Sequence, residues 1–424
     1  MALRGTLTVP GDKSITHRAI ILGALADGEA VITNYCPGED CLRTAQAFQA
    51  LGVPIEIAPD RMRVTGKGLR GLREPESIVD CGNSGTGIRL LAGVLAGQDF
   101  FSVLTGDESI RRRPMGRVVG PLREMGALIT GRGGGELAPL AISGTRLRGI
   151  KYRSPIISAQ VKSSVLLAGL FAEGTTTVIE RALSRDHTER LFEYFGIPLT
   201  RHGLTVSVTG PRTFAAKDVP VAGDLSAAAF FLVGASLVPD SDVTITGVGI
   251  NPTRTGILEV LQEMGARIDL VNPRTQAGEP VADLRVRAAP LRGVTVGPER
   301  IPKTIDEFPI LCVAAACAQG ETIIAGASEL RVKESDRIAT MAMELRLLGA
   351  EVEERPDGMR IRGGRPLKGA TCQSHGDHRV AMSLVIAGLV TQGETRVEDM
   401  ACVATSFPGF EKNLRGLLTP SGQG

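Results

Sequence analysis

Residues Asp80–Gly106, DCGNSGTGIRLLAGVLAGQDFFSVLTG, contain the pattern from which the whole chain is built. A polar, glycine-rich head (GNSGTG) leads to Arg89, then to a short apolar run that favours a helix, and then to a β-rich run, FFSVLTG. Small residues at a helix start allow backbone N–H groups to point at an anion, and Arg89 adds a full charge to the helix dipole. This stretch therefore predicts an α/β unit whose helix start binds phosphate or carboxylate.

The same pattern recurs in five further stretches, which gives six copies at a spacing of roughly 60 to 80 residues. These stretches begin at Ala19, Val165, Ala227, Pro309 and Met382. In five copies a second helix follows and ends in an apolar residue and a glycine, as in FQALG, LREMG, FEYFG, LQEMG and LRLLG. Glycine at this position is the usual left-handed helix stop. We predict an α/β fold of six units.

The chain of 424 residues is too long for one ordinary core, so the six units divide naturally as three and three. The stretch DVPVAGDLS, residues 218–226, has Pro and Gly halfway through the repeats and suggests a crossing between domains. A strand predicted at Leu3–Val9 comes before the first full copy and would belong with the second half. We therefore expect one domain at 12–221 and a second formed by 1–11 plus 222–424.

The composition narrows the classes of function. A net charge of +2, 4% aromatic residues and no Trp argue against a nucleic-acid binder that works by charge or by base stacking. No apolar run approaches the length that spans a bilayer, and the first residues do not form a signal peptide. The seven cysteines, mostly in apolar or turn contexts, fit reduced thiols. We expect a cytoplasmic monomer without nucleic-acid or membrane partners.

Two candidate metal sites and one nucleotide-binding motif are incomplete in the sequence. Cys36 and Cys41 lack a second pair of ligands, and His375 and His378 lack a third ligand. The stretch GDKS follows a predicted strand, as in phosphate-binding loops, but the required G-x-x-x-x-G-K-[ST] is missing. The sequence therefore predicts no metal and no cofactor.

Cations recur close to the predicted helix starts, and two carboxylates stand among them. The cations are Lys13, Arg18, Arg89, Arg113, Lys333, Arg337 and Arg379, and the carboxylates are Asp306 and Glu334. If every unit packs alike, these residues converge, so that the cations hold a polyanionic substrate while each carboxylate moves a proton. The alternative for each cation is an ordinary surface charge, which we expect for Arg111 and Arg112.

Some polar residues near these helix starts have a purely structural alternative. Ser14 or Thr16 could cap the first helix. In SPIISAQVKSS, Ser158 and Gln160 could cap a helix or bind a ligand, and both possibilities stay open.

The chain resembles the enolpyruvyl transferase family along its whole length. The resemblance rests on GDKSITHR, GNSGTGIR, RRPMG, SAQVKS, the DEFP head, LRVKESDR, GDHRVAM and the ending TSFPGF. It implies a two-domain inverse α/β barrel of six βαβαββ units, three per domain, with the active site between the domains. It also implies the substrates phosphoenolpyruvate and shikimate 3-phosphate, with addition through a tetrahedral intermediate and then elimination of phosphate, without metal or covalent enzyme.

The resemblance also implies roles for individual residues. Lys13, Ser14 and Arg18 are similar to the family's first binding segment. The expected contacts to the shikimate phosphate and ring hydroxyls are Ser158, Gln160, Ser184 and Lys333. The expected phosphoenolpyruvate site comprises Gly85, Arg113, Arg337 and Arg379, and Asn83 of the same head is expected among the binding residues. Asp306 resembles the base that takes the proton of the 5-hydroxyl, and Glu334 with Lys13 resembles the group that handles the proton at the methylene carbon.

Three positions depart from the pattern of many relatives. Thr405 stands where many have Lys, His187 where some have Tyr, and Glu329 where some have Asn. These departures put contact details in doubt. Glyphosate occupies the phosphoenolpyruvate site in this family, and a tolerant branch has Ala where this chain has Gly85. Because a Cβ at this position would project toward the ligand, we expect sensitivity, and Gly85→Ala to weaken glyphosate more than phosphoenolpyruvate.

Two other functions stay open at this point. The first is the sister enzyme that transfers enolpyruvyl to UDP-N-acetylglucosamine and uses a reactive Cys in the loop corresponding to Thr105–Gly116, which has none here. The second is a non-catalytic anion-binding scaffold, which would be expected to lose Asp306 or Glu334.

Overall fold

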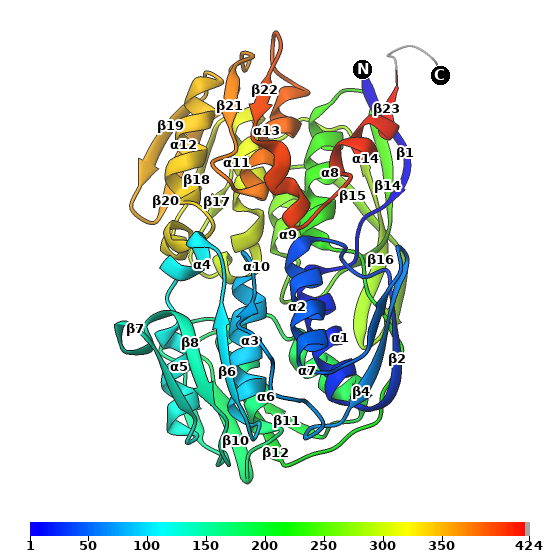
Figure 1. The fold of residues 1–424 in the computed structure, drawn as a ribbon. Helices are drawn as coiled ribbons and strands as arrows, with labels where there is room; N and C mark the ends of the chain where they lie inside the picture. The colour runs from blue at the N-terminus through cyan, green and yellow to red at the C-terminus, as the bar shows by residue number, and fades with distance from the viewer. Residues whose placement is uncertain (420–424) are drawn as a thin grey trace. The chain divides into compact units, whose positions relative to one another are not determined.

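The computed structural model describes residues 1–419, which form an α/β protein with two compact units (Figure 1). Unit 1 comprises Met1–Pro10, Ala222–Thr275 and the chain from Pro280 onward. Unit 2 comprises Gly11–Val221 and Gln276–Glu279.

This division differs from the expected boundaries at Gly11 and at residues 276–279, which both belong to unit 2. The segment 276–279 is the turn between two long strands, and side chains of unit 2 hold it. Arg190 donates to the Gly278 carbonyl at 3.2 Å, and Gln276 donates to the Pro220 carbonyl at 3.1 Å. No composition shift in the sequence marks this turn.

Unit 2 contains three four-stranded sheets with one common strand pattern. In each sheet the first strand is parallel to the second, and the remaining neighbours are antiparallel. The strand orders are β13 (Val219–Pro220), β2 (Asp27–Thr33), β4 (Arg61–Lys67), β3 (Ile55–Ile57); β5 (Val79–Asp80), β6 (Phe101–Thr105), β8 (Leu137–Ser143), β7 (Leu128–Arg132); and β9 (Lys151–Arg153), β10 (Gly174–Ile179), β12 (Thr205–Gly210), β11 (Leu199–His202).

Unit 1 contains sheets of five, four and two strands, and each sheet again includes one parallel pair. The parallel pairs are β1 with β14, β17 with β18, and β21 with β22. The strand orders are β15 (Arg267–Gln276), β16 (Glu279–Arg287), β14 (Asp242–Gly249), β1 (Ala2–Thr8), β23 (Leu418–Thr419); β17 (Thr295–Val296), β18 (Glu321–Ile324), β20 (Gly358–Arg362), β19 (Glu351–Arg355); and β21 (Thr371–Gln373), β22 (Arg396–Glu398).

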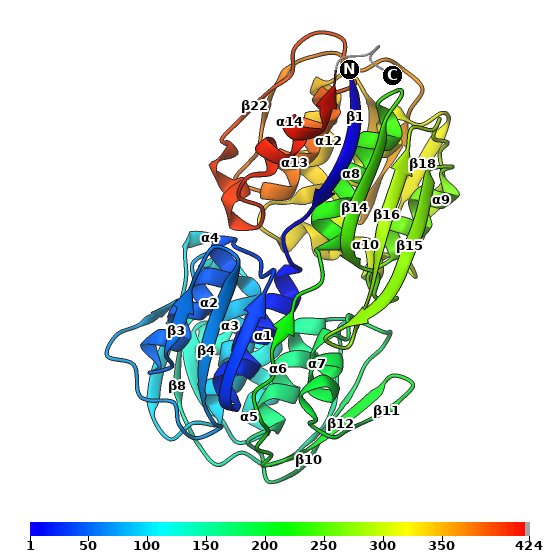
Figure 2. The same cartoon turned by 90° about the vertical axis from the view of Figure 1, so that its right-hand side faces the viewer.

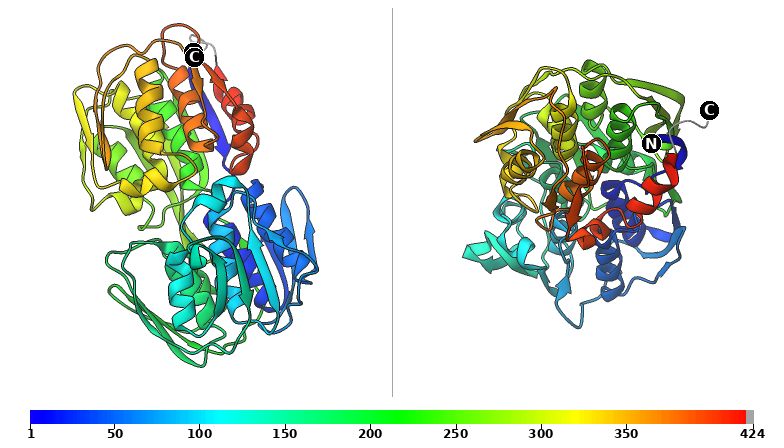
Figure 3. Two further views of the ribbon diagram at one scale, coloured as in Figure 1. Left: turned by 60° about the vertical axis from the view of Figure 1, so that its left-hand side comes forward. Right: turned by 90° about the horizontal axis from the view of Figure 1, so that it is seen from above.

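Strands β1 and β13 pair with partners far away in the sequence. Arg4 of β1 lies opposite Asp242 of β14, whereas Val219 of β13 lies opposite Ile32 of β2. Figure 2 shows β1 beside β14 in unit 1. The C-terminal helix α14 (Phe410–Leu417) packs along β1 as well (Figure 3). The strand before the first helix therefore completes a sheet of unit 1.

Each unit has three helices that are buried on nearly all sides. They are α1 (Lys13–Leu25), α3 (Gly85–Ala96) and α6 (Ala159–Gly169) in unit 2, and α8 (Leu225–Leu237), α11 (Phe308–Cys317) and α13 (His378–Gly388) in unit 1. Helices α8 and α11 are apolar all round, which is typical of helices inside a core, whereas the other four also bury charged residues. Within residues 1–419, no helix has the length and apolar character needed to cross a membrane.

The other helices lie closer to the surface. They are α2 (Glu39–Ala50), α4 (Glu108–Arg112), α5 (Gly116–Glu124), α7 (His187–Phe195), α9 (Gly256–Glu263), α10 (Ile301–Thr304) and α12 (Arg337–Leu347), with short 3₁₀ turns η1 (Gly133–Gly135), η2 (Ile305–Glu307), η3 (Ser328–Val332) and η4 (Met400–Thr405). Five of these helices end in the glycines predicted as stops, Gly52, Gly126, Gly196, Gly265 and Gly349. Their φ angles lie between 80° and 103°, so the predicted left-handed stops are confirmed.

Candidate active site

The start of α1 presents Lys13 and Ser14 and is capped by Asp12. The Asp12 carboxylate accepts a hydrogen bond from the Ile15 amide at 2.9 Å, so the prediction of Ser14 or Thr16 as the cap is wrong. Asp12 is the cap because it lies one residue before the helix and its side chain reaches the amide of the third helical residue. Lys13 donates to the Asp40 carboxylate at 2.9 Å. The Lys13 ammonium is thereby fixed at the helix start.

Arg18 lies one turn further along α1 and is buried. Its Nε donates to the Thr188 hydroxyl at 2.6 Å, Nη2 to the Ser163 hydroxyl at 2.7 Å, and Nη1 to the Ser14 carbonyl at 2.8 Å. Burial, and after it the charge of Arg185, lowers the pKa of Arg18 to about 10. Arg18 stays charged at neutral pH, although all three acceptors are neutral.

The head of α3 brings together residues from three elements. Arg89 donates to the Gln160 amide oxygen at 2.6 Å and to the Pro114 carbonyl at 3.0 Å. Arg113 is buried, with Nη1 3.4 Å from the Asn83 carbonyl. Its neighbours Arg111 and Arg112 are exposed, which confirms the prediction that of these three only Arg113 points inward.

At Gly85, two guanidinium groups occupy the space where a larger residue would place its Cβ. A Cβ on residue 85 would lie 2.8 Å from Arg113 Nη1 and 3.1 Å from Arg89 Nη1. The expectation that such a Cβ acts directly on a ligand therefore needs correction. It would first displace the arginine side chains.

Ser158 and Gln160 at the start of α6 do different things. Ser158 caps the helix, since its hydroxyl accepts from the Val161 amide at 3.4 Å. Gln160 is not a cap. Its amide oxygen accepts from Arg89 and its amide nitrogen donates to the Thr86 hydroxyl at 3.0 Å, so it ties α6 to α3.

Ser184 follows β10 and is buried beside three charged side chains. Its hydroxyl donates to the Glu180 carboxylate. Lys162 of α6 lies 2.8 Å from Glu180 and 2.7 Å from Glu189 of α7. Neither Lys162 nor its two carboxylate partners were among the residues predicted from sequence.

In unit 1, Arg337 is the centre of a buried ion network. Its side chain is only 1% exposed; Nε donates to Asp377 at 2.8 Å and Nη2 to Glu334 at 2.8 Å. Burial alone would lower the pKa of Arg337, but Asp377 and Glu334 outweigh it and raise the pKa. For Asp377, burial would raise the pKa, but Arg337 outweighs it and the pKa is lowered.

Asp306 lies in η2 between two arginines. Its Oδ2 is 3.3 Å from Arg254 Nη1, and its Oδ1 is 4.0 Å from Arg337 Nη1. The neighbouring Glu307 is fully buried, lies 3.6 Å from Arg254, and accepts from the Ser226 hydroxyl. Burial raises the pKa of Glu307. Two of the predicted residues of unit 1, Asp306 and Glu334, therefore share Arg337.

Three of the predicted site residues, Lys333, Glu334 and Arg379, lie near the starts of α12 and α13. Helix α12 begins at Arg337 with Asp336 as its cap, so Lys333 and Glu334 precede the helix rather than open it. Lys333 follows η3. Arg379 is the second residue of α13 and is buried, and its amide donates to Asp377 at 2.9 Å.

The histidines considered as metal ligands have other surroundings. His375 Nε2 lies 2.7 Å from a Glu344 carboxylate oxygen. Among residues 1–419, no group of three or more His, Cys, Asp or Glu side chains is arranged to hold a metal ion.

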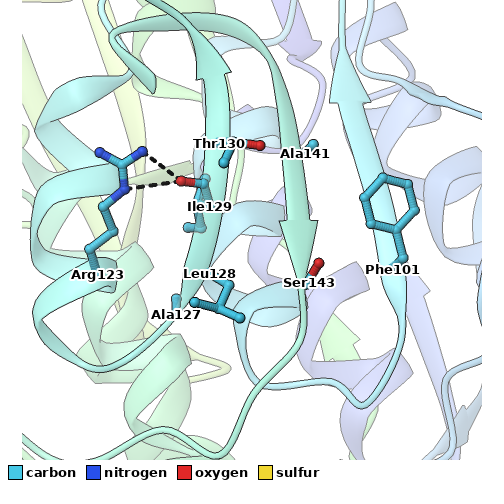
Figure 4. Close-up of a pocket in the computed structure, with 8 residues that line it drawn as sticks. All are labelled: Phe101, Arg123, Ala127, Leu128, Ile129, Thr130, Ala141 and Ser143. Carbon is cyan, nitrogen blue, oxygen red and sulfur yellow. Dashed lines mark hydrogen bonds between the residues drawn. The ribbon is translucent and has the colours of Figure 1, made fainter. Parts of the chain in front are cut away.

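A surface pocket of about 340 Å³ lies on the outer sheet of unit 2, away from the predicted site residues (Figure 4). Strands β6, β7 and β8 line it with Phe101, Leu128, Ile129, Thr130, Ala141 and Ser143, together with Ala127 and Arg123. Arg123 donates twice to the Ile129 carbonyl, at 3.0 and 2.6 Å, and so braces the edge strand. The pocket contains no group suited to proton transfer.

Sequence reasoning missed Arg254 and Asp377, which hold the predicted residues of unit 1. Arg254 occurs in NPTRTG, where Pro and Gly around a single Arg resemble the other polar heads and could have drawn attention to it. Asp377 occurs in the motif GDHRVAM, next to Arg379, and its position before a helix could have identified it as a cap.

Comparisons with known proteins agree over the whole chain. Residues 1–414 match the family described as EPSP synthase (3-phosphoshikimate 1-carboxyvinyltransferase). The chain is 58% identical over 419 residues to the 3-phosphoshikimate 1-carboxyvinyltransferase of Pelotomaculum thermopropionicum, covering 98% of this chain and 97% of that protein. It is 53% identical over 417 residues to that of Citrifermentans bemidjiense, with the same coverage of both chains. A solved structure of EPSP synthase from Acinetobacter baumannii superposes with a TM-score of 0.89 at 45% identity, over 98% of this chain and 96% of that one. The chain therefore belongs to the EPSP synthase family, the 3-phosphoshikimate 1-carboxyvinyltransferases.

Proposed function

We propose a division of roles among the residues of this EPSP synthase. The enzyme acts in the shikimate pathway and transfers the enolpyruvyl group of phosphoenolpyruvate to the 5-hydroxyl of shikimate 3-phosphate, with release of phosphate. Both substrates carry several negative charges, so the reaction needs cations for binding and separate groups for proton transfer. The buried arginines beside helix starts supply the cations for binding. The carboxylates around Arg337 supply the groups for proton transfer.

In unit 2, we assign shikimate 3-phosphate to the heads of α1 and α6. Lys13, Ser14 and Arg18 contribute a hydroxyl and two cations, and Ser158, Gln160 and Ser184 contribute polar groups. Lys333 of unit 1 is assigned to the same substrate. The observation that carries this assignment is the Arg18 guanidinium, which is buried and charged but bonded to neutral acceptors.

Phosphoenolpyruvate is assigned to a second set of residues. Asn83, Gly85 and Arg113 supply the head of α3 in unit 2, and Arg337 and Arg379 supply two cations of unit 1. The absence of a Cβ at Gly85 lets the guanidinium of Arg113 approach the helix start, where backbone N–H groups also favour an anion.

The chemistry needs one proton removed from the 5-hydroxyl and one delivered to the methylene carbon. Asp306 accepts the hydroxyl proton as the oxygen attacks C2 of phosphoenolpyruvate, while Glu334 with Lys13 protonates C3. The tetrahedral intermediate then loses a methyl proton to the same pair as the C–O bond to phosphate breaks. The pair of Glu334 and Lys13 thereby recovers the proton that it gave in the addition step. Asp306 passes the hydroxyl proton to the departing phosphate, so the enzyme ends unchanged.

We further propose that the six parallel strand pairs mark six βαβαββ units, three in each half, as in an inverse α/β barrel. Three sheets around three buried helices in each unit support this assignment. The monomeric state, the cytoplasmic location and the absence of metal and cofactor stay predictions.

The two alternative functions lose their support. The loop Thr105–Gly116 has no cysteine, and the relatives that share more than half of the sequence are named for the shikimate substrate. A non-catalytic scaffold has no need for Asp306 and Glu334 beside Arg337.

A phosphate-release assay with both substrates tests the proposed division. We expect release only when phosphoenolpyruvate and shikimate 3-phosphate are present together. Lys13→Met should weaken the binding of both substrates and lower turnover. Release with UDP-N-acetylglucosamine in place of shikimate 3-phosphate would contradict the assignment.

A further inference from the structure

A buried charge network lies behind Ser184 and Arg18 in unit 2, and the mechanism above does not use it. Lys162 is 2% exposed and donates to Glu180 at 2.8 Å, to Glu189 at 2.7 Å and to the Ser184 carbonyl at 3.4 Å. Its two carboxylate partners are equally buried. The network connects α6, the end of β10 and α7.

The charges of this network balance only when Arg18 is included. Lys162 and Arg18 carry two positive charges, and Glu180 and Glu189 carry two negative charges, so the four side chains are neutral together. Glu189 acts on Arg18 through space, since its charge raises the Arg18 pKa against the larger effect of burial. Without Lys162, these four positions would carry one net negative charge, while the other charges that act on Arg18, those of Arg185, Asp12 and Glu279, would stay as they are.

Lys162 and Glu180 affect whether the Ser184 hydroxyl can donate a hydrogen bond to an anion. A serine hydroxyl has one proton, and Ser184 gives it to Glu180. It can donate to a phosphate oxygen only by releasing Glu180. The Glu180 carboxylate remains hydrogen-bonded after that release, because the Lys162 ammonium donates to its other oxygen. Lys162 therefore lowers the cost of turning the Ser184 hydroxyl outward.

We propose that Lys162 is a positioning residue for the phosphate of shikimate 3-phosphate. It cancels the charge of Glu180 and Glu189 behind Ser184 and Arg18, and so keeps this part of unit 2 receptive to a dianion. The inference rests on the proposed function, which assigns Ser184 and Arg18 to this substrate. A purely structural role is the alternative, since buried ion networks also tie elements together.

Charge-changing variants separate the two roles. Lys162→Met leaves a net charge of −1, Glu180→Gln leaves +1, and the double variant returns to zero. The Glu180→Gln amide can offer its oxygen to Lys162 and its NH₂ to the Ser184 oxygen, which frees the hydroxyl proton for phosphate. Lys151→Met, at an exposed position of the same unit, serves as the matched control.

Steady-state kinetics for each substrate, with calorimetric titration of shikimate 3-phosphate, provide the test. We expect Lys162→Met to raise the KM for shikimate 3-phosphate about tenfold or more, with kcat and the phosphoenolpyruvate KM within about threefold. Glu180→Gln should leave that KM unchanged or lower it. The double variant should return to within about threefold of wild type. Lys151→Met should match wild type throughout.

The proposal would be overturned by a higher KM for shikimate 3-phosphate in both single variants, or by a double variant worse than either one. Equal increases in KM for the two substrates would also overturn it. If Lys162→Met does not fold, the KM values of Glu180→Gln and of the charge-balanced double variant for shikimate 3-phosphate still test the proposal. Wild-type protein that releases no phosphate would contradict the proposed function instead, and the titration would still measure this inference.

Discussion

Arg18 of unit 2 and Arg337 of unit 1 are held in opposite ways. In unit 2, Arg18 bonds to two hydroxyls and a main-chain carbonyl, and among residues 1–419 it has no carboxylate within 4.0 Å. In unit 1, Arg337 bonds to Asp377 and Glu334, and Arg254 lies among Asp224, Asp306 and Glu307. The first arrangement leaves a guanidinium charge for an anion to neutralise. The second uses arginine to hold carboxylates in place.

This difference suggests that one fold pattern serves two tasks. Neutral acceptors orient the Arg18 guanidinium without neutralising its charge, so Arg18 can bind a phosphate strongly. Carboxylates held by an arginine keep their position, so they can exchange protons with a substrate at a fixed place. Two lysines of unit 2, Lys13 and Lys162, differ from Arg18 because each pairs with a carboxylate.

The largest effect should come from breaking the support of Arg337. Asp377→Asn removes the charge of its closest buried partner, and we expect a loss of about 3–5 kcal/mol in the free energy of unfolding. Urea denaturation followed by circular dichroism measures it. Asp269→Asn, at an exposed ion pair of unit 1, should cost less than about 1 kcal/mol. Similar losses of unfolding free energy in both variants would mean that the buried Arg337 network stabilises the fold no more than an exposed ion pair does.

Acid should abolish the same contribution. The folded state lowers the pKa of Asp377 below the ordinary 3.8, so its ionised form stabilises the fold above that value. The stability is lost as the pH falls from about 3.8 through the lower folded pKa. The difference between wild type and Asp377→Asn should therefore shrink below about pH 4.

Removing the proposed base should separate catalysis from binding. Asp306→Asn keeps the shape of the side chain but removes the proton acceptor, so turnover should fall by a factor on the order of a hundred or more. Binding of shikimate 3-phosphate, measured by calorimetry, should remain. Turnover close to wild type would identify another group as the base.

A smaller effect is expected at the head of α3. The Cβ of Gly85→Ala would push on Arg113 and Arg89, and we expect glyphosate binding to weaken by roughly 1–3 kcal/mol more than phosphoenolpyruvate binding. Inhibition constants and KM values of both forms measure the difference. Gly120→Ala, where a Cβ meets no atom within 4 Å, is the matched control. Equal inhibition constants for wild type and Gly85→Ala would rule out the steric account.

The smallest effect should come from the cysteine nearest to this head. Cys81 is buried, and burial followed by the charge of Asp80 raises its pKa, so it stays a thiol at neutral pH. Cys81→Ser should keep activity within about tenfold of wild type. A covalent adduct at Cys81, detected by mass spectrometry together with lost activity, would favour nucleophilic chemistry.

The sequence predicted the helix stops and the burial of Arg113 well because their signals are local. The helix stops follow from single glycines, and the inward position of Arg113 follows from its place before Pro114. The networks behind these residues were not predictable in the same way. Arg254 reaches Asp306 from 52 positions away, and His187 bonds to Glu279 across 92 positions. Such contacts depend on how distant parts of the chain pack together within each unit, which no local pattern encodes.

The helix caps reveal a smaller limit of sequence reasoning. Ser14, Thr16 and Asp12 are all good capping residues, and they differ only in where the helix begins. The structure selects Asp12 because α1 begins at Lys13. For Ser158 and Gln160, the side-chain types allowed both capping and binding, and only the bond from Arg89 separates their roles.

Because β1 pairs with β14, it can complete its sheet only after β14 has been synthesised. Leu3 bonds to Ser241, 238 residues later, and at about 5–20 residues per second the first strand waits roughly ten to fifty seconds for its partner. The strands of unit 2 are all made by residue 220, so that half can assemble first. Strand β1 therefore finds its partner only after every strand of unit 2 has been made.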